Sequence, residues 1–176
     1  VAPIGEYAQS ALGRERMFQY GSTEHGTPVT ILRLNYAVEL RYGVLLDVAE
    51  KVHAGKPIDL TMGHVNVIWQ GDANAVALRS LAIAASPATV LNLTGTETIP
   101  VRRVAEELGE LLGKRPVFSG KEGETALLNN AAQCTRRFGA PRIAVEQVLR
   151  WVAYWVTRGG RTLDKPTKFQ VRDGKF

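Results

Sequence analysis

The sequence predicts an α/β protein built on parallel strands. Two short runs of mainly apolar and β-branched residues, Val29–Leu34 and Thr89–Leu93, have the composition of strands covered on both faces. Helical patterns lie between them, and a parallel crossover requires an intervening helix. With 45% apolar and 22% charged residues among 176, the composition is that of an ordinary globular chain with one core.

The first predicted element is a helix over Glu6–Tyr20, which is rich in good helix formers although its apolar period is loose. A loop over residues 21–28 leads into the first strand. The next helix, Gly43–Ala54, carries apolar residues at helical spacing, and Gly55 followed by Pro57 ends it.

An excursion follows this helix, with two short strands predicted at Ile58–Met62 and Val65–Trp69. Asp72 is expected to cap a helix that runs through Ala85. After the second core strand we expect a helix Val101–Leu112 with Pro100 near its first turn and Gly113 at its end, an extended piece Pro116–Phe118, and helices Leu127–Phe138 and Val145–Thr157.

The positive charge is concentrated at the end of the chain. From Arg158 onward, six basic residues less two acidic ones give +4 of the net +5. Because no aromatic residues interleave these cations on a groove-sized face, we interpret residues 159–176 as a loosely ordered, solvated basic tail, with a phosphate or nucleic-acid contact as the weaker alternative. We therefore expect no nucleic-acid partner.

Other features of the composition favour a cytoplasmic protein. Apolar runs stay well below the roughly 20 residues of a membrane helix, and the first residues lack the pattern of a signal peptide. Cys134, the one cysteine, cannot form an intrachain disulfide, has no zinc-ligand spacing around it, and is expected to be a packed thiol. We predict no metal site and no membrane partner.

The predicted sheet is too small to stand alone. Two parallel strands make a poor independent fold, so a segment that completes the sheet is expected to belong to the intact protein.

Six segments in order carry a resemblance to a known family. They are Tyr7-Ala-Gln-Ser-Ala-Leu-Gly-Arg-Glu-Arg16, Ile31-Leu-Arg-Leu-Asn35, Gln70-Gly-Asp-Ala-Asn-Ala75, Val90-Leu-Asn-Leu-Thr-Gly95, Pro100-Val-Arg-Arg-Val-Ala-Glu-Glu-Leu-Gly109 and Phe138-Gly-Ala-Pro141. Their order and spacing over residues 1 to about 158 resemble the C-terminal half of extended short-chain dehydrogenase/reductases of the NAD-dependent epimerase/dehydratase family.

The resemblance implies a domain plan. Residues 1–36 would end the core of the dinucleotide domain, which is the C-terminal part of a Rossmann-like parallel sheet. Residues 37–158 would form a smaller mixed α/β substrate-binding lobe, with one core strand returning at residues 89–93, and residues 159–176 would be the basic tail. The expected partners are the protein's own N-terminal dinucleotide-binding half, a second copy joined through the helix Glu6–Tyr20 or the open edge of the strand Val29–Leu34, and a small-molecule substrate.

The resemblance also implies a cofactor. NAD or NADP is expected in the intact protein, held at a glycine-rich turn in the N-terminal half. The sequence contains no Gly-x-Gly-x-x-Gly pattern, so this chain alone is expected to bind neither.

Tyr7 matches the tyrosine that acts as general acid/base in this family. Such a tyrosine needs a neighbouring cation, which in the family is a lysine one helical turn later. Ala11 occupies that position here, and the nearest cations in sequence are Arg14 and Arg16. An ordinary aromatic at the start of a helix is the competing interpretation of Tyr7.

The remaining candidate residues follow the strands, where binding groups gather in α/β sheets. The resemblance places the cofactor against Arg33, Leu34 and Asn35. The candidate substrate-binding residues are Asn35, Glu39, Arg41, Tyr42, Asn66, Trp69 and Gln70. Val65 stands where nucleotide-sugar members have an arginine that binds phosphate, and a surface or packing role is the alternative for each candidate.

Three functions follow. The first is the substrate-binding half of an NAD(P)-dependent oxidoreductase, epimerase or dehydratase that acts on a small polar or sugar-like substrate. The second is a binding or regulatory module of the same fold without turnover, which Ala11 favours. The third is an interaction protein that docks an acidic partner through the basic tail.

Overall fold

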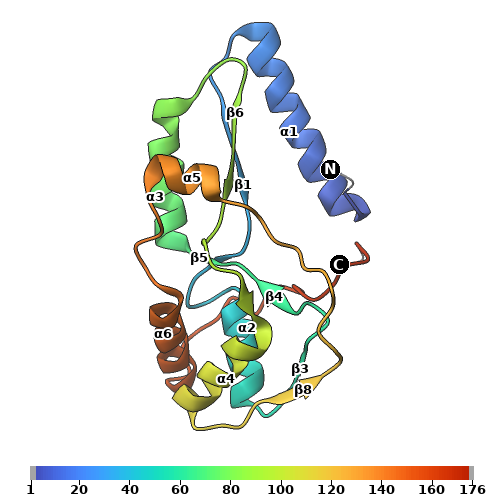
Figure 1. The fold of residues 1–176 in the computed structure, drawn as a ribbon, viewed down its shortest axis with the longest axis vertical. Coiled ribbons are helices and arrows are strands. Elements are labelled where there is room, and N and C mark those ends of the chain that lie inside the picture. Colours follow the sequence, from blue (N-terminus) through green and yellow to red (C-terminus); the bar gives the residue numbers. More distant parts are fainter. Residues whose placement is uncertain (1–2, 175–176) are drawn as a thin grey trace.

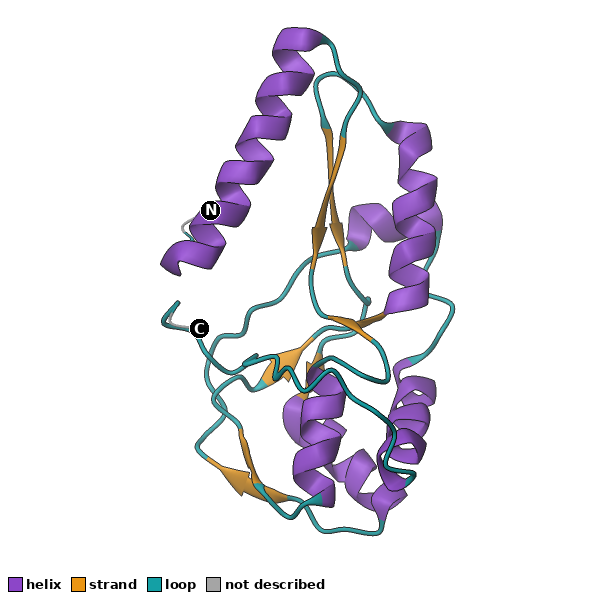
Figure 2. Ribbon diagram, turned by 180° about the vertical axis from the view of Figure 1, so that it is seen from behind, coloured by secondary structure: helices purple, strands orange, loops and turns teal. Residues whose placement is uncertain are grey.

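The computed structural model describes residues 3–174 and divides into two regions. In the upper region of Figure 1, the strands β1 (Thr30–Leu34) and β6 (Thr89–Leu93) lie between the helices α1 (Gly5–His25) and α3 (Gln70–Ser80). In the lower region, the helices α2 (Val44–His53), α4 (Val101–Leu112) and α6 (Val145–Thr157) pack together. Figure 2 shows the same two regions from behind.

The two core strands are parallel and adjacent, as predicted. Thr30 pairs with Thr89 and Leu34 with Leu93, so the two strands are in register over their whole length. Both strands therefore end at the same edge of the sheet.

The lower region, which we call the lobe, contains the larger core. Its helices contribute apolar faces at helical spacing, and Leu45, Leu108 and Val152 have no exposed surface. Ile58 and Leu60 join them from the excursion after α2. Burying this many large side chains makes the lobe the more stable part of the molecule.

Short strand pairs connect the excursion to the rest of the chain. β2 (Ala37–Val38) pairs with β5 (Ile68–Trp69) in parallel, β3 (Pro57–Asp59) with β8 (Val117–Ser119) in parallel, and β4 (His64–Val65) with β7 (Ile99–Pro100) antiparallel. The prediction of one strand over Val65–Trp69 is wrong, because Asn66 and Val67 separate β4 from β5.

Three helix predictions need correction. α1 runs to His25, so residues 21–25 are helical where a loop was predicted. α3 begins at Gln70 and ends at Ser80, a 3₁₀ turn η1 (Leu81–Ile83) follows, and its N-cap residue is Trp69. Asp72 is not the cap, because its carboxylate accepts a hydrogen bond from the backbone N–H of Ile143 at 2.9 Å and so ties α3 to the segment before α6.

The helix predicted over Leu127–Phe138 is shorter than expected. α5 spans Ala132–Phe138 and packs on β6 rather than in the lobe. The side chain of Asn130 accepts a hydrogen bond from the backbone N–H of Ala132 at 2.9 Å, and such local contacts compete with a helix. Cys134 of α5 is buried beside Leu93, as predicted for a packed thiol.

The end of the chain is not a solvated tail. Phe169 is 4% exposed and belongs to the lobe core, and the backbone N–H of Leu163 donates to the carbonyl of Arg41 at 3.0 Å. A single aromatic residue among cations carries no periodic signal, which is why the sequence did not reveal this contact. We call residues 161–174 the strap; Lys175 of the predicted basic tail lies outside the described residues.

None of the helices within residues 3–174 is long and apolar enough to cross a membrane.

Candidate functional site

Polar groups meet at the carboxyl ends of β1 and β6. Asn35 follows β1 directly, and its backbone N–H donates to the carbonyl of Leu93, the last residue of β6, at 3.0 Å. Thr94 and Gly95 follow β6 at the same edge. In α/β sheets this edge is where ligands bind.

Three asparagines from distant parts of the sequence form a cluster at this edge, which we call the asparagine cluster. The side-chain N–H of Asn35 donates to Asn66 Oδ1 at 2.8 Å. The side-chain N–H of Asn66 donates to the carbonyl of Asn129 at 2.7 Å, and the side-chain N–H of Asn129 donates to the carbonyl of Arg33 at 2.9 Å. Asn66 is 4% exposed, so its amide holds the other two in place.

The segment after β6, Thr94 and Gly95, packs against the backbone of the residues next to this cluster. Thr94 is buried, and its hydroxyl donates to the carbonyl of Asn66 at 3.1 Å. A side chain at Gly95 would come within 2.0 Å of the carbonyl oxygen of Val67, so this close approach requires glycine.

A pocket of about 740 Å³ opens between this edge, α1 and the strap, and we call it the Tyr7 pocket. Its polar lining comes from five parts of the chain: Tyr7 and Glu15 from α1, Arg33 from β1, Asn92 from β6, Asn129 from the loop before α5, and Arg172 from the strap. Tyr7 is 68% exposed, and its ring forms part of the wall.

Ala11 also lines the Tyr7 pocket, one helical turn after Tyr7. The spacing predicted that these two positions share a face, and the structure places both there. Arg14 and Arg16 are exposed and are not among the residues that line the pocket; Arg16 instead donates to the side chain of Gln19 at 3.2 Å.

Arg33 is engaged by Glu15. Its Nε donates to Glu15 Oε2 at 2.9 Å, and its Nη2 donates to the other carboxylate oxygen. The hydrogen bond from Arg33 holds the pKa of Glu15 below its ordinary value, against the opposing effect of burial, and the same bond raises the pKa of Arg33. Arg33 therefore joins β1 to α1 at the pocket wall.

A second pocket of about 640 Å³ adjoins the Tyr7 pocket, with Asn129 lining both. Its lining is rich in amides and hydroxyls, which include Asn66, Thr96, Thr98 and Asn130. We call it the amide pocket. Neutral donors and acceptors of this kind suit hydroxyl groups.

The structure brings some of the predicted residues together and separates others. Tyr7 and Arg33 share the Tyr7 pocket, and Asn35 and Asn66 lie together in the asparagine cluster beside it. Leu34 is 54% exposed at the end of β1.

The other candidates lie apart from that cluster. Glu39 and Arg41 form an ion pair at 3.1 Å, and the carbonyl of Tyr42 accepts the backbone N–H of Glu39. Trp69 packs its ring against Trp151 of α6, with centroids 5.2 Å apart, and Gln70 is exposed at the start of α3.

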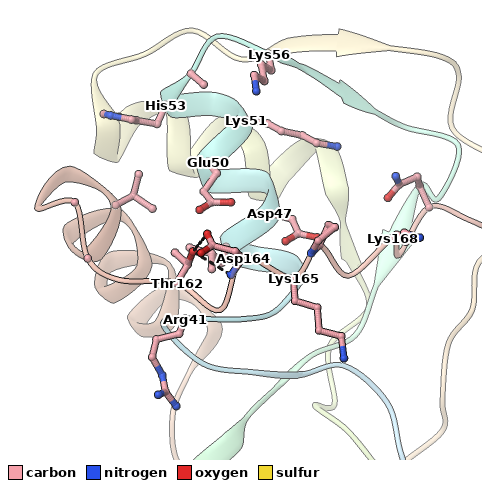
Figure 3. Close-up of a pocket in the computed structure, with 17 residues that line it drawn as sticks. Arg41, Asp47, Glu50, Lys51, His53, Lys56, Thr162, Asp164, Lys165 and Lys168 are labelled. Carbon is pink, nitrogen blue, oxygen red and sulfur yellow. Dashed lines mark hydrogen bonds between the residues drawn. The ribbon is translucent and has the colours of Figure 1, made fainter. Parts of the chain in front are cut away.

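Arg41 lines a different pocket, of about 770 Å³ between α2 and the strap, which we call the α2 pocket (Figure 3). Its acidic groups are Asp47, Glu50 and Asp164, and burial, followed by the charges of Asp47 and Asp164, raises the pKa of Glu50. Among residues 3–174, the α2 pocket shares no lining residue with the Tyr7 pocket. The Tyr7 pocket, which contains residues of β1 and β6, is therefore the better candidate for the active site.

Sequence reasoning missed Asn92, Asn129 and Arg172. Asn92 was counted only as part of a strand, Asn129 fell inside a predicted helix, and Arg172 fell inside the tail. The adjacent pair Asn129–Asn130 was the available signal, because two asparagines disfavour a helix interior.

The comparisons with known proteins agree with this architecture. No protein-family model and no curated protein matches the sequence. Among solved structures, the chain is similar to the UDP-glucose 4-epimerase of Thermus thermophilus in complex with NAD, with 18% identity, a TM-score of 0.69, and coverage of 84% of this chain and 52% of that one.

Two further solved structures show the same similarity. The UDP-glucuronic acid 4-epimerase of Bacillus cereus has 13% identity and a TM-score of 0.75, with 89% of this chain and 54% of that one covered. The dTDP-glucose 4,6-dehydratase of Bacillus anthracis has 19% identity and a TM-score of 0.70, with coverage of 90% and 54%.

The chain therefore has the α/β fold of the NAD-dependent epimerases and dehydratases, as the sequence motifs predicted. It spans about half the length of these proteins.

Residues 3–174 lack the part of a dinucleotide site that holds the pyrophosphate. The ends of β1 and β6 with the Tyr7 pocket beside them offer space and polar groups, but no helix in residues 3–174 follows a glycine-rich turn of the kind that holds a pyrophosphate. The same residues contain no group of three or more histidine, cysteine, aspartate or glutamate side chains placed to hold a metal ion.

Proposed function

We propose that this chain is the substrate-binding half of an NAD(P)-dependent oxidoreductase of the epimerase/dehydratase type, which acts on a small polar or sugar-like substrate. The observation that carries the proposal is the Tyr7 pocket, where a tyrosine on α1 lines the same cavity as Arg33 and Asn92 of the two parallel core strands. The three solved structures compared above are two epimerases and a dehydratase, and each is a complex with NAD.

In this proposal Tyr7 handles the proton. As the phenolate, Tyr7 would accept the proton of a substrate hydroxyl as a carbonyl forms, and as the phenol it would return that proton in the reverse step. The asparagine cluster would hold the sugar-like part through amide hydrogen bonds, and the bound dinucleotide would supply the hydride acceptor. Arg33, Leu34 and Asn35 would border the dinucleotide at the end of β1.

The partners also belong to the proposal. The dinucleotide would be bound by the protein's own N-terminal half along the open edge of β1, and a second copy would pack on α1. The chain alone is expected to bind neither NAD nor NADP below about 1 mM, because the phosphate-holding turn belongs to the other half.

A non-catalytic binding module of the same fold is the second candidate. Ala11 favours it, because the wall of the Tyr7 pocket lacks a lysine one turn after Tyr7. The third hypothesis, an acidic partner docked on a solvated tail, gains no support, since the strap packs on the lobe.

The test uses the full-length protein that the gene encodes, which contains residues 1–176 and any residues that precede Val1. Turnover is followed by product analysis after incubation with NAD or NADP and with nucleotide sugars or sugar acids, because an epimerase or dehydratase returns the hydride and leaves no net reduced nicotinamide. Nicotinamide absorbance is recorded as well and detects a net oxidation. Tyr7→Phe should lower turnover by about 10²- to 10⁴-fold. Tyr20→Phe is the matched control, because Tyr20 is exposed on the same helix and does not line the pocket.

The outcomes separate the candidates. Turnover that depends on Tyr7 supports the enzyme. Dinucleotide binding without turnover supports the module, and neither binding nor turnover contradicts both.

A further inference from the structure

The strap carries a cation to the Tyr7 pocket. It runs from the end of α6 past α2 and finishes beside the first turn of α1, so the two ends of the described chain lie close together (Figure 1). Arg172, near its end, lines the Tyr7 pocket with Tyr7, Asn92 and Asn129.

The strap is fixed at several points, so Arg172 is positioned before any ligand arrives. The backbone N–H of Thr167 donates to Asp47 Oδ2 at 2.8 Å, and its hydroxyl donates to the same oxygen (Figure 3 shows Asp47 beside the strap). Phe169 is buried in the lobe core. Gly174 lies against Gly5, where a side chain on Gly5 would come within 2.5 Å of the Gly174 carbonyl oxygen.

The charge of Arg172 is not used within the described residues. Its Nη2 donates to the neutral hydroxyl of Thr125 at 2.6 Å, and no carboxylate among residues 3–174 forms an ion pair with it. Arg33, the other cation in the lining, is already held by Glu15. A guanidinium has five N–H donors, so Arg172 retains donors for a ligand.

The positive charge of Arg172 also affects the pKa of Tyr36, which lies just after β1. Tyr36 follows Asn35 and is half-buried, and its pKa is raised by burial, while the charge of Arg172 acts in the opposite direction. This effect agrees with a guanidinium that lies near the end of β1.

We infer that Arg172 is the anion-binding residue of the Tyr7 pocket and that the substrate carries a phosphate or carboxylate group which it binds. Thr125 is the positioning residue that orients the guanidinium. The inference rests on the proposed function for the assignment of this pocket to the substrate.

The test titrates the 176-residue chain with inorganic phosphate at low ionic strength, and amide chemical shifts report binding. The wild type should show saturable shifts at Asn92, Asn129 and Arg172. Arg172→Gln should weaken binding by about tenfold or more, because a charged hydrogen bond is lost, and Thr125→Val should weaken it by a smaller factor.

Arg161→Gln is the matched control, since it removes the same charge from the same strap but does not line the Tyr7 pocket. It should bind phosphate as the wild type does. Glucuronate and glucose distinguish the source of the anion: glucuronate stronger than phosphate assigns a carboxylate, and phosphate stronger than glucuronate assigns a phosphate. Both results support the inference. It is overturned if neutral glucose binds as tightly as the two anions.

Two other results would also overturn it: no saturable binding of either phosphate or glucuronate by the wild type, or an equal loss of binding in Arg161→Gln and Arg172→Gln. The proposed function fails separately. A complete protein without turnover leaves the phosphate result standing, while an active protein in which Arg172→Gln does not change KM for an anionic substrate refutes the role of Arg172 alone.

Discussion

The two regions of the molecule differ in what holds them together. In the lobe, α2, α4 and α6 bury Leu45, Leu108 and Val152 completely. In the upper region, by contrast, α1 exposes Met17 and Phe18 by 69% and 56%. The lobe is thus stabilised by its own side chains, whereas the layer of α1, β1 and β6 presents apolar surface suited to another partner.

The contacts that hold α1 are mainly polar. Ser22 is buried, and its hydroxyl donates to the carbonyl of Ala85 at 3.3 Å. Glu15 binds Arg33, and Gly5 touches Gly174 at the end of the strap. Polar contacts fix the direction of a helix but contribute little stability, so we expect α1 to be held more weakly than the helices of the lobe.

The largest expected effect is on molecular mass. Among the described residues, β1 pairs only with β6 and α1 exposes apolar side chains. Open strand edges and exposed apolar surfaces of this kind favour association. We expect the chain to be a homodimer or to retain an N-terminal companion. Light scattering measures the mass, and mass spectrometry detects the companion. A monodisperse monomer of 19.3 kDa with no companion would show that the upper region needs no partner.

The next largest effect is on the stability of the lobe. Leu45→Ala should lower the free energy of unfolding by about 2–5 kcal/mol, because it leaves a cavity in a core where Leu45 has no exposed surface. Met17→Ala on α1 should change it by less than about 0.5 kcal/mol, since Met17 is exposed. Urea unfolding followed by tryptophan fluorescence gives both values. If both variants lost the same free energy of unfolding, the lobe and the upper region would not differ in how strongly their side chains stabilise them.

A smaller effect is expected where the regions meet, at the asparagine cluster. Asn66→Ala removes the acceptor of Asn35 and a donor to the carbonyl of Asn129, which should cost about 1–3 kcal/mol of unfolding free energy. Asn74→Ala on the exposed face of α3 is the control and should be near neutral. Unfolding by urea measures this difference as well, and a neutral Asn66→Ala would mean that water replaces the lost amide.

The lobe and the core strands could be predicted from the sequence because their signals are local. The period of α2, α4 and α6 and the composition of β1 and β6 each lie within one short segment. The shared wall of Tyr7 and Ala11 follows from helical spacing alone.

The site could be predicted only in part because tertiary contacts build it. Asn35 and Asn66 lie 31 residues apart, and their contact depends on how β4 and β5 break around Asn66. Arg172 reaches the Tyr7 pocket because Phe169 is anchored in the lobe core, and one aromatic residue among cations gives no periodic pattern from which to predict that contact.

The smallest effect concerns the ion pair that joins α1 to β1. The pKa of Glu15 is lowered in the folded chain, chiefly by the hydrogen bond from Arg33. Its stabilising contribution is therefore fully present above the ordinary carboxyl pKa of 4.5 and is lost as the pH falls through the lower, folded value. Glu15→Gln should remove this part of the pH dependence and cost about 0.2–1 kcal/mol at neutral pH, as for other exposed ion pairs.

The measurement for Glu15 must report on α1 itself, because Trp69, Trp151 and Trp155 all lie outside it. Carbon chemical shifts of residues 5–25, recorded across the acidic range, follow the helix directly. In the wild type the shifts of α1 should move toward coil values below about pH 4.5, while in Glu15→Gln they should stay nearly constant. Glu122→Gln is the control, since Glu122 pairs with Arg102 in the lobe and should leave the α1 profile unchanged. Glu122→Gln could instead flatten the pH dependence of the α1 chemical shifts as much as Glu15→Gln does. Acid would then unfold the whole molecule at once, and α1 would not be the weakly held helix that its polar contacts indicate.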